Sequence, residues 1–198
     1  VERNDMHDAV HVRLMVTRGD KTTPSQHPAN VIGGPNMVII AEHKRADPQV
    51  TAEGITLFTA TIRRPPPDTL DQRINSHSKL HEVIALIQAT HAGADEALLL
   101  DPEGYVAEGS GENVFIVKNG TIYTPEVTAC LNGITRATVL ALASQFNIPV
   151  VEKRITRDEV YIADEAFFTG TAAEVTPIRE LDGRIIGEGK RGPVTEEL

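Results

Sequence analysis

Alternating apolar and polar positions predict several β-strands in this chain. The runs Val10–Thr17, Met37–Ala41 and Ile55–Ile62 have the alternation and β-branched composition of strands. The sequence Arg63-Arg64-Pro65-Pro66-Pro67 should end the third run, because proline cannot continue a hydrogen-bonded ladder. Residues 21–36 are rich in Thr, Pro, Asn and Gly and predict a loop. Further runs with strand composition are 97–100, 114–117, 121–123, 150–152 and 167–171.

Helical spacing is clearest in Ser76–His91, where Leu80, Val83, Ile84 and Ile87 fall on one apolar stripe. Residues 133–146 predict a second helix and Thr156–Ile162 a short one, and the last residues predict the start of another. Strands and helices are mixed without strict alternation. The expected fold class is therefore α+β, in one domain.

Charge and composition exclude some function classes. The chain has 198 residues and a formal net charge of -9, which argues against sequence-independent binding of nucleic acid because such binding needs a basic face. No apolar run approaches the roughly 18 residues of a membrane span. Cys130 is the single cysteine, and we expect it to fill core space in a reduced, cytoplasmic protein.

The chemistry is concentrated between Gly104 and Arg136. Glu108 ends a short apolar run and is followed by a Gly-Ser-Gly turn, and Asn119-Gly120 predicts a hairpin further on. The stretch ends at Gly133-Ile134-Thr135, where a helix is expected to begin. Free N–H groups at a helix start bind anions. The stretch thus predicts an acid on a strand and a phosphate-sized anion site.

Of the polar residues around this acid, we expect one or two among Asp101, Glu112 and Asn113 to hydrogen-bond the loop.

Several motifs in fixed order carry a family resemblance. AEGSGENVFIV is followed by TP, by GITR, by ADEAFFTGTAAEVTPIRELDGR and by GEGKRGPVT. This order resembles the class IV pyridoxal-phosphate aminotransferases, most closely the branched-chain amino acid aminotransferases, from about Val10 to the C-terminus. The resemblance implies that residues 1–198 are mainly the cofactor-binding large domain of the D-amino acid aminotransferase-like architecture (fold type IV), with the small N-terminal domain missing. Residues 1–20 would be the tail of that domain or the interdomain region.

The resemblance also implies residue roles around pyridoxal 5'-phosphate. Glu108 would keep the pyridine nitrogen protonated, and Leu131 would pack on the ring. The phosphate would be held at Gly133, Ile134 and Thr135, joined by the turn at Gly170 and Thr171.

Substrate contacts are implied at two places. The backbone of Thr171 and Ala172 matches the contacts to the substrate carboxylate. His11 and Arg13 match an inward-facing pair on the first strand, where the family has Tyr in place of His11.

The lysine that should form the internal aldimine is the departure from the family. A register without gaps places it at Asn75, and asparagine cannot form an aldimine. Lys79, one helical turn further on if the segment is helical, is the alternative in a shifted register.

By resemblance the expected reaction is amino-group transfer between a branched-chain L-amino acid and 2-oxoglutarate in a homodimer. A D-amino acid or R-selective amine transaminase, an aminodeoxychorismate lyase, and a catalytically silent relative that binds the cofactor or another phosphate ligand remain alternatives. His77 and His81 are spaced four apart, but no third ligand is evident, so no metal site is expected.

Overall fold

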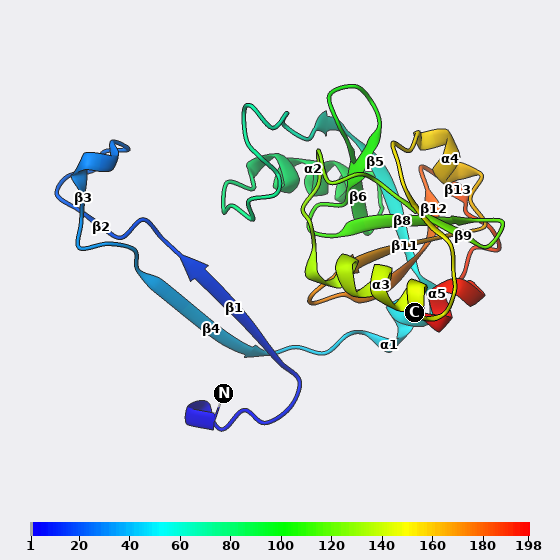
Figure 1. Cartoon of the computed structure of the whole chain (residues 1–198), viewed down its shortest axis with the longest axis horizontal. Helices are drawn as coiled ribbons and strands as arrows, with labels where there is room; N and C mark the ends of the chain where they lie inside the picture. Colours follow the sequence, from blue (N-terminus) through cyan, green and yellow to red (C-terminus); the bar gives the residue numbers. More distant parts are fainter. Residues whose placement is uncertain (1) are drawn as a thin grey trace. The chain divides into compact units, whose positions relative to one another are not determined.

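The computed structural model describes residues 2–198, and the chain divides into two compact units at Arg45 and Ala46. In the first unit, β1 (Val10–Val16) and β4 (Met37–His43) form an antiparallel ladder. The expected loop 21–36 is more ordered than predicted. It contains β3 (Val31–Ile32), which pairs with β2 (Asp20–Lys21), and a single turn of 3-10 helix (Figure 1).

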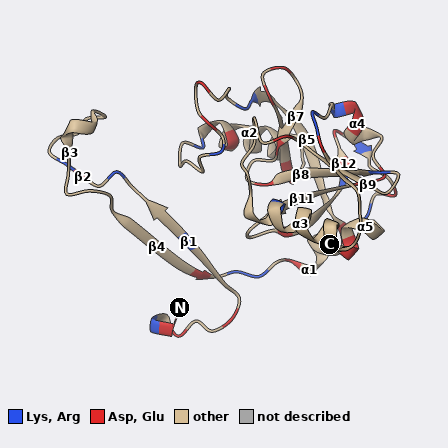
Figure 2. Ribbon diagram, in the orientation of Figure 1, with Lys and Arg blue, Asp and Glu red and all other residues tan. Residues whose placement is uncertain are grey.

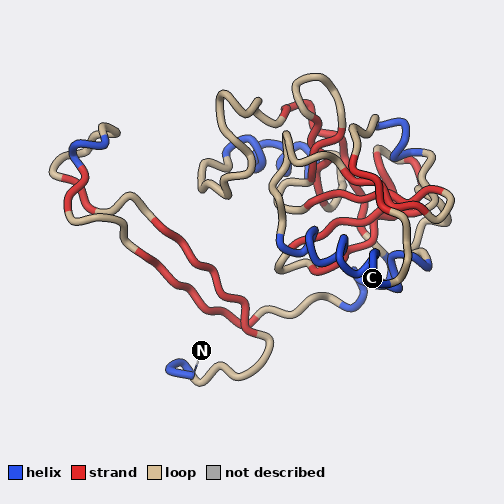
Figure 3. Tube along the Cα trace, in the orientation of Figure 1, coloured by secondary structure: helices blue, strands red, loops and turns tan. Residues whose placement is uncertain are grey.

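A nine-stranded mixed sheet organises the second unit (Figures 1 and 3). Its order is β10-β9-β8-β11-β12-β5-β6-β7, with β13 paired to β12. The sheet nearly closes on itself, because Val106 N of β7 donates a hydrogen bond to the Ile155 carbonyl just beyond β10. The strands are β5 (Ile55–Arg63), β6 (Glu96–Leu100), β7 (Val106–Glu108), β8 (Asn113–Lys118), β9 (Thr121–Thr124), β10 (Val150–Glu152), β11 (Glu165–Gly170), β12 (Glu174–Leu181) and β13 (Arg184–Ile185).

Strand alternation divides the core between the two faces of this sheet. In β8, Val114 and Ile116 join the larger cluster, while Phe115 and Val117 face the other side. Phe115 stacks on Phe167 of β11 with ring centres 4.9 Å apart. Helix α3 (Ile134–Gln145) covers that second cluster, and α5 (Pro193–Glu197) packs against β11.

Helix α2 (Leu80–His91) differs most from expectation. It begins four residues later than predicted, and residues 74–79 before it are irregular. The apolar stripe Leu80, Val83, Ile84 and Ile87 is exposed. The buried face carries Glu82, Ala85 and Ala89 instead, and the two alanines pack against β5 and β6. Small residues allow this close approach, so the apolar stripe predicted the helix but not its buried face.

The remaining helices agree with expectation or were missed. α3, α4 (Arg157–Tyr161) and α5 lie where the sequence predicts helices, and the α+β class is confirmed. Helix α1 (Pro48–Glu53), capped by the Asp47 side chain, was not predicted, and neither was strand β12. Charged residues of both signs are distributed over the second unit (Figure 2).

Two glycines with positive φ provide a test of the packing after β13. Gly187 (φ +54°) lies against the Asp164 carbonyl oxygen, which an added Cβ would overlap, while Gly183 (φ +77°) has open space around it. Gly183→Ala should cost about 1 kcal/mol of unfolding free energy, from backbone strain alone. Gly187→Ala should cost about 3 kcal/mol, because the backbone must also shift. Urea unfolding of both variants measures this, and equal losses would contradict the packing described.

Candidate functional site

Glu108, the predicted acid, is buried in an ion-paired cluster. It ends β7 with 2% of its surface exposed, and Arg64, 4% exposed, pairs with it from the end of β5. The Arg64 Nη1 group also donates to Glu82 Oε1 of α2 at 2.7 Å. Arg64 N donates to the Leu100 carbonyl at 2.9 Å, which fixes its backbone. One guanidinium therefore holds two buried carboxylates from different elements.

The neighbours of this cluster set its protonation. Burial raises the pKa of Glu108, and the Arg64 charge and the Leu131 N–H oppose that rise. Burial lowers the pKa of His81. The neutral ring fits the geometry, since His81 Nε2 lies 2.8 Å from Arg64 Nη1 and Nδ1 lies 3.1 Å from Glu82 Oε2.

A chain of hydrogen bonds links the acid to the start of α3. Leu131 N lies 3.3 and 3.2 Å from the two carboxylate oxygens of Glu108. The Leu131 carbonyl accepts from Asn113 Nδ2 at 2.7 Å and from Gly133 N at 3.0 Å. An added Cβ at Gly133 would lie 2.2 Å from Asn113 Oδ1, so a larger residue there would displace the Asn113 side chain. The expected hydrogen bond to the turn after Glu108 is made by Glu112, whose Oε2 accepts from Gly111 N at 3.0 Å.

The start of α3 presents backbone donors. Gly133 is the N-cap residue and supplies no side-chain hydrogen bond, so the N–H groups of Ile134 and Thr135 are not capped by it. With twelve residues, α3 is long enough for its dipole to favour an anion at this end.

The second glycine turn lies beside the loop that follows Glu108. The Glu112 side chain lies close to both turns. A Cβ added at Gly109 would lie 3.0 Å from Glu112 Oε2, and a Cβ added at Gly170 would lie 3.4 Å from Glu112 Cγ. Thr171 and Ala172, which follow Gly170, are exposed. The structure therefore places Gly170 near the loop that follows Glu108.

The two candidates for the covalent residue differ in their surroundings. Asn75 is exposed in the irregular segment, five residues before α2. Lys79 immediately precedes the helix, and its Nζ lies 3.6 Å from Glu82 Oε1. The two residues are not one helical turn apart, because the segment between them is not helical. The same irregularity removes His77 from the helix, so the expected i,i+4 pair with His81 does not form.

Comparison with known proteins identifies the family. The model of the family "Amino-transferase class IV" matches residues 1–181. The chain belongs to the class IV aminotransferases. The resemblance inferred from the motifs is therefore confirmed.

Relatives and solved structures agree with this class IV assignment. The chain is 64% identical to the branched-chain-amino-acid aminotransferase of Pseudomonas aeruginosa over 147 residues, which cover 74% of the chain and 48% of that protein. It is 43% identical to a putative branched-chain-amino-acid aminotransferase of Methanocaldococcus jannaschii over 98% of the chain and 66% of that protein. The chain thus spans about half the length of the Pseudomonas relative.

Two crystal structures of branched-chain amino acid aminotransferases share the fold. One is complexed with N-(5'-phosphopyridoxyl)-L-glutamate and superposes with a TM-score of 0.90 and 39% identity, covering 98% of the chain and 63% of that structure. The other, from Thermoproteus uzoniensis with norvaline, superposes with a TM-score of 0.84 and 38% identity, covering 95% of the chain and 61% of that structure. The fold assignment is therefore confirmed.

Arg64 and Glu82 are the site residues that the sequence did not reveal. Arg64 was interpreted only as part of a charged and proline-rich strand end, and Glu82 lies inside an apparently ordinary helix. A glutamate on the same helix face as the small residues Ala85 and Ala89 was the available signal.

Burial and spacing describe three further features of the chain. Cys130 is buried as expected, and burial raises the pKa of its thiol to about 12, so it is not an activated nucleophile. Across residues 2–198 no group of three or more His, Cys, Asp or Glu is placed to hold a metal ion. In the same part of the chain, no helix has both the length and the apolar character needed to cross a bilayer.

Arg64 should be the residue on which this cluster depends. Arg64→Gln leaves Glu82 and Glu108 buried without their cation, and should lower the free energy of unfolding by about 3–5 kcal/mol. Arg154→Gln, which breaks an exposed pair with Glu103, should cost under about 1 kcal/mol. Urea unfolding at neutral pH measures both, and a similar small loss for the two variants would refute the buried clamp.

Glu112 should make stability depend on pH. Burial, followed by the charges of Glu96 and Glu108, raises the pKa of its carboxyl from 4.5 to about 7. Between these two values the unfolded chain ionises before the folded one, so the folded state loses stability as pH rises. Glu112→Gln removes that loss and should stabilise the protein by roughly 2–3 kcal/mol at pH 8 and much less at about pH 5. The exposed Glu126→Gln variant is the control. If Glu112→Gln changes the free energy of unfolding equally at both pH values, the pKa of the Glu112 carboxyl is not raised in the folded protein.

Proposed function

We propose that this chain supplies the ring and phosphate contacts of a pyridoxal 5'-phosphate site for transamination between a branched-chain L-amino acid and 2-oxoglutarate. The observation that carries the proposal is the buried Glu108, held by Arg64 and linked through Leu131 to the uncapped start of α3. Ala46–Leu198 would be the cofactor-binding large domain. Relatives of this chain are named as branched-chain aminotransferases, which supports the substrate class.

The donor set fits the cofactor at both of its ends. Arg64 engages one oxygen of Glu108, and Oε2 has the Leu131 N–H at 3.2 Å, which leaves acceptor capacity for a ring N–H. The absence of a side-chain cap on α3 within the described residues suits a phosphate on the N–H groups of Ile134 and Thr135. When bound, the cofactor supplies a ring that accepts electrons from the amino acid's α-carbon.

The chain's own groups have separable tasks. Glu108 holds the ring proton with a charge-assisted bond, and Arg64 holds Glu108 in place. Leu131 packs on the ring. Thr171 adds a hydroxyl at the phosphate, and Gly170 shapes that turn.

Substrate binding is proposed at two further places. The exposed backbone of Thr171 and Ala172 would contact the substrate carboxylate. His11 and Arg13 lie two apart on β1, so both side chains project to the same face of that strand. We propose that they contact substrate in a cytoplasmic homodimer whose protomer also has a small N-terminal domain.

A second candidate function is favoured by Asn75. An exposed asparagine at the position of the family's lysine points to a relative that binds the cofactor without turnover. The amide cannot form the covalent bond, whereas the acid and phosphate groups are retained.

Covalent trapping separates these candidates. The chain, Asn75→Lys, Lys79→Ala and the double variant are incubated with pyridoxal 5'-phosphate, reduced with borohydride and mapped by peptide mass. We expect no selective label in the parent and a label at residue 75 in Asn75→Lys, with or without Lys79. Lys118, at the end of β8 with its side chain 40% exposed, serves as the measure of nonspecific labelling. Amino-group transfer by Asn75→Lys would establish the enzyme framework.

Two other results would change the conclusion. A selective label at Lys79 in the parent, lost in Lys79→Ala, would make Lys79 the covalent residue. If no variant is labelled more strongly than Lys118, the proposed cofactor site is refuted.

A further inference from the structure

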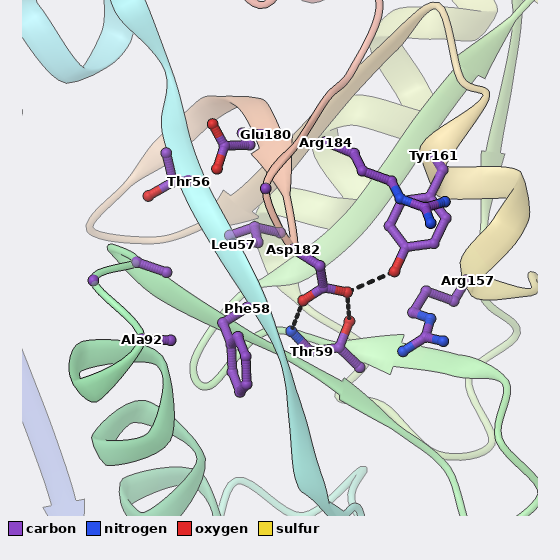
Figure 4. Close-up of a pocket in the computed structure, with 13 residues that line it drawn as sticks. Thr56, Leu57, Phe58, Thr59, Ala92, Arg157, Tyr161, Glu180, Asp182 and Arg184 are labelled. Atoms are coloured by element: carbon purple, nitrogen blue, oxygen red, sulfur yellow. Dashed lines mark hydrogen bonds between the residues drawn. The ribbon is translucent and has the colours of Figure 1, made fainter.

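A pocket of about 580 Å³ lies between β5, the β12–β13 turn and α4 (Figure 4). It is lined by residues 56–59 of β5, residues 92–94 after α2, Arg157 and Tyr161 of α4, and Glu180, Asp182, Gly183 and Arg184 at the β12–β13 turn. None of these residues belongs to the Glu108 cluster. The volume is within the range of small-molecule sites.

A half-buried carboxylate with several hydrogen-bond donors lies in this pocket. The Asp182 carboxylate accepts three hydrogen bonds at 2.6 Å, from Thr59 N, Thr59 Oγ1 and the Tyr161 hydroxyl. Burial and Asp182 raise the pKa of Tyr161 to about 12, so its hydroxyl remains a donor. Asp182 therefore has its charge balanced by these donors and does not need an arginine.

Two arginines at the Tyr161 wall have unused donors. The guanidinium carbon of Arg184 lies 4.5 Å from the Tyr161 ring centre, and that of Arg157 lies 5.7 Å from it. In the described part of the chain neither arginine has a carboxylate within ion-pair distance. Arg154 provides the contrast, since it lies 4.9 Å from the Tyr105 ring but pairs with Glu103 at 2.6 Å.

The opposite wall limits the charge of a ligand. Glu180 and Thr56 lie on the other side of Asp182 from Tyr161 and Arg157 (Figure 4). A carboxylate there repels a molecule that is anionic at both ends. The pocket thus favours one oxyanion group at the arginine wall and a neutral or cationic remainder.

We propose that this pocket is a second binding site, for a small molecule whose single carboxylate or phosphate group is held by Arg157 and Arg184. Guanidinium groups match both oxyanions with paired N–H donors, and stacking on Tyr161 pre-orients them. The inference does not depend on the transamination site.

NMR of the arginine Nε–H groups tests the site residue by residue. The chain is titrated with inorganic phosphate and, separately, with acetate, at ionic strength held constant with sodium chloride. We expect saturable shifts of the Arg157 and Arg184 signals and none of Arg154. Arg184→Gln should weaken binding seen at Arg157 by about ten-fold or more, since it removes charge-assisted hydrogen bonds. Arg154→Gln is the matched control and should leave the affinity unchanged.

The two titrations distinguish the ligand chemistry. Tighter phosphate binding assigns a phosphate-bearing ligand, and tighter acetate binding a carboxylate. Shifts that do not saturate with either anion, or that Arg154 shares, would overturn the proposal. Both arginines are exposed, so these substitutions leave the core intact.

Discussion

The candidate site depends on the two ion pairs that the Arg64 guanidinium makes. This guanidinium joins the end of β5 to Glu82 on α2 and to Glu108 on β7, residues 18 and 44 positions away in sequence. Removing charges from water costs several kcal/mol per ion, so each carboxylate is tolerable only with its partner in place. The pairing therefore fixes three elements together around Glu108. Under the proposed function, it would hold this acid in a fixed position beside the protonated ring atom.

The proposed anion site is positioned by the same network. The Leu131 N–H donates to Glu108, and the Leu131 carbonyl accepts from Asn113 and Gly133. The loop before α3 is therefore held from both sides. The donors at the helix start are thus set relative to the acid by the protein's own hydrogen bonds. Such pre-ordering lowers the entropy that a ligand loses on binding.

Local chemistry explains which parts of this arrangement were predictable from sequence. Glu108, Gly133 and the helix after it carry short-range signals: an acid before a glycine turn, and a glycine at a helix start. Arg64 carries none, because its importance comes from a contact between distant segments, and Glu82 is marked only by its place on the helix face of Ala85 and Ala89. The apolar stripe of α2 gave the wrong buried face for a related reason. Periodicity shows that Leu80 to Ile87 share a face, but only the tertiary structure shows that alanines occupy the buried one.

The position of β12 has a consequence for the order of folding during synthesis. β12 lies between β11 and β5, and its pairing brings Ile178 beside Ile55. Asp182 then reaches back 123 residues to bond Thr59. A ribosome must therefore make almost the whole chain before β5 gains this neighbour. Until then one edge of β5 stays unpaired, and contacts of such long range form slowly. A polypeptide that stopped before β12 would leave two half-sheets with an open seam between them.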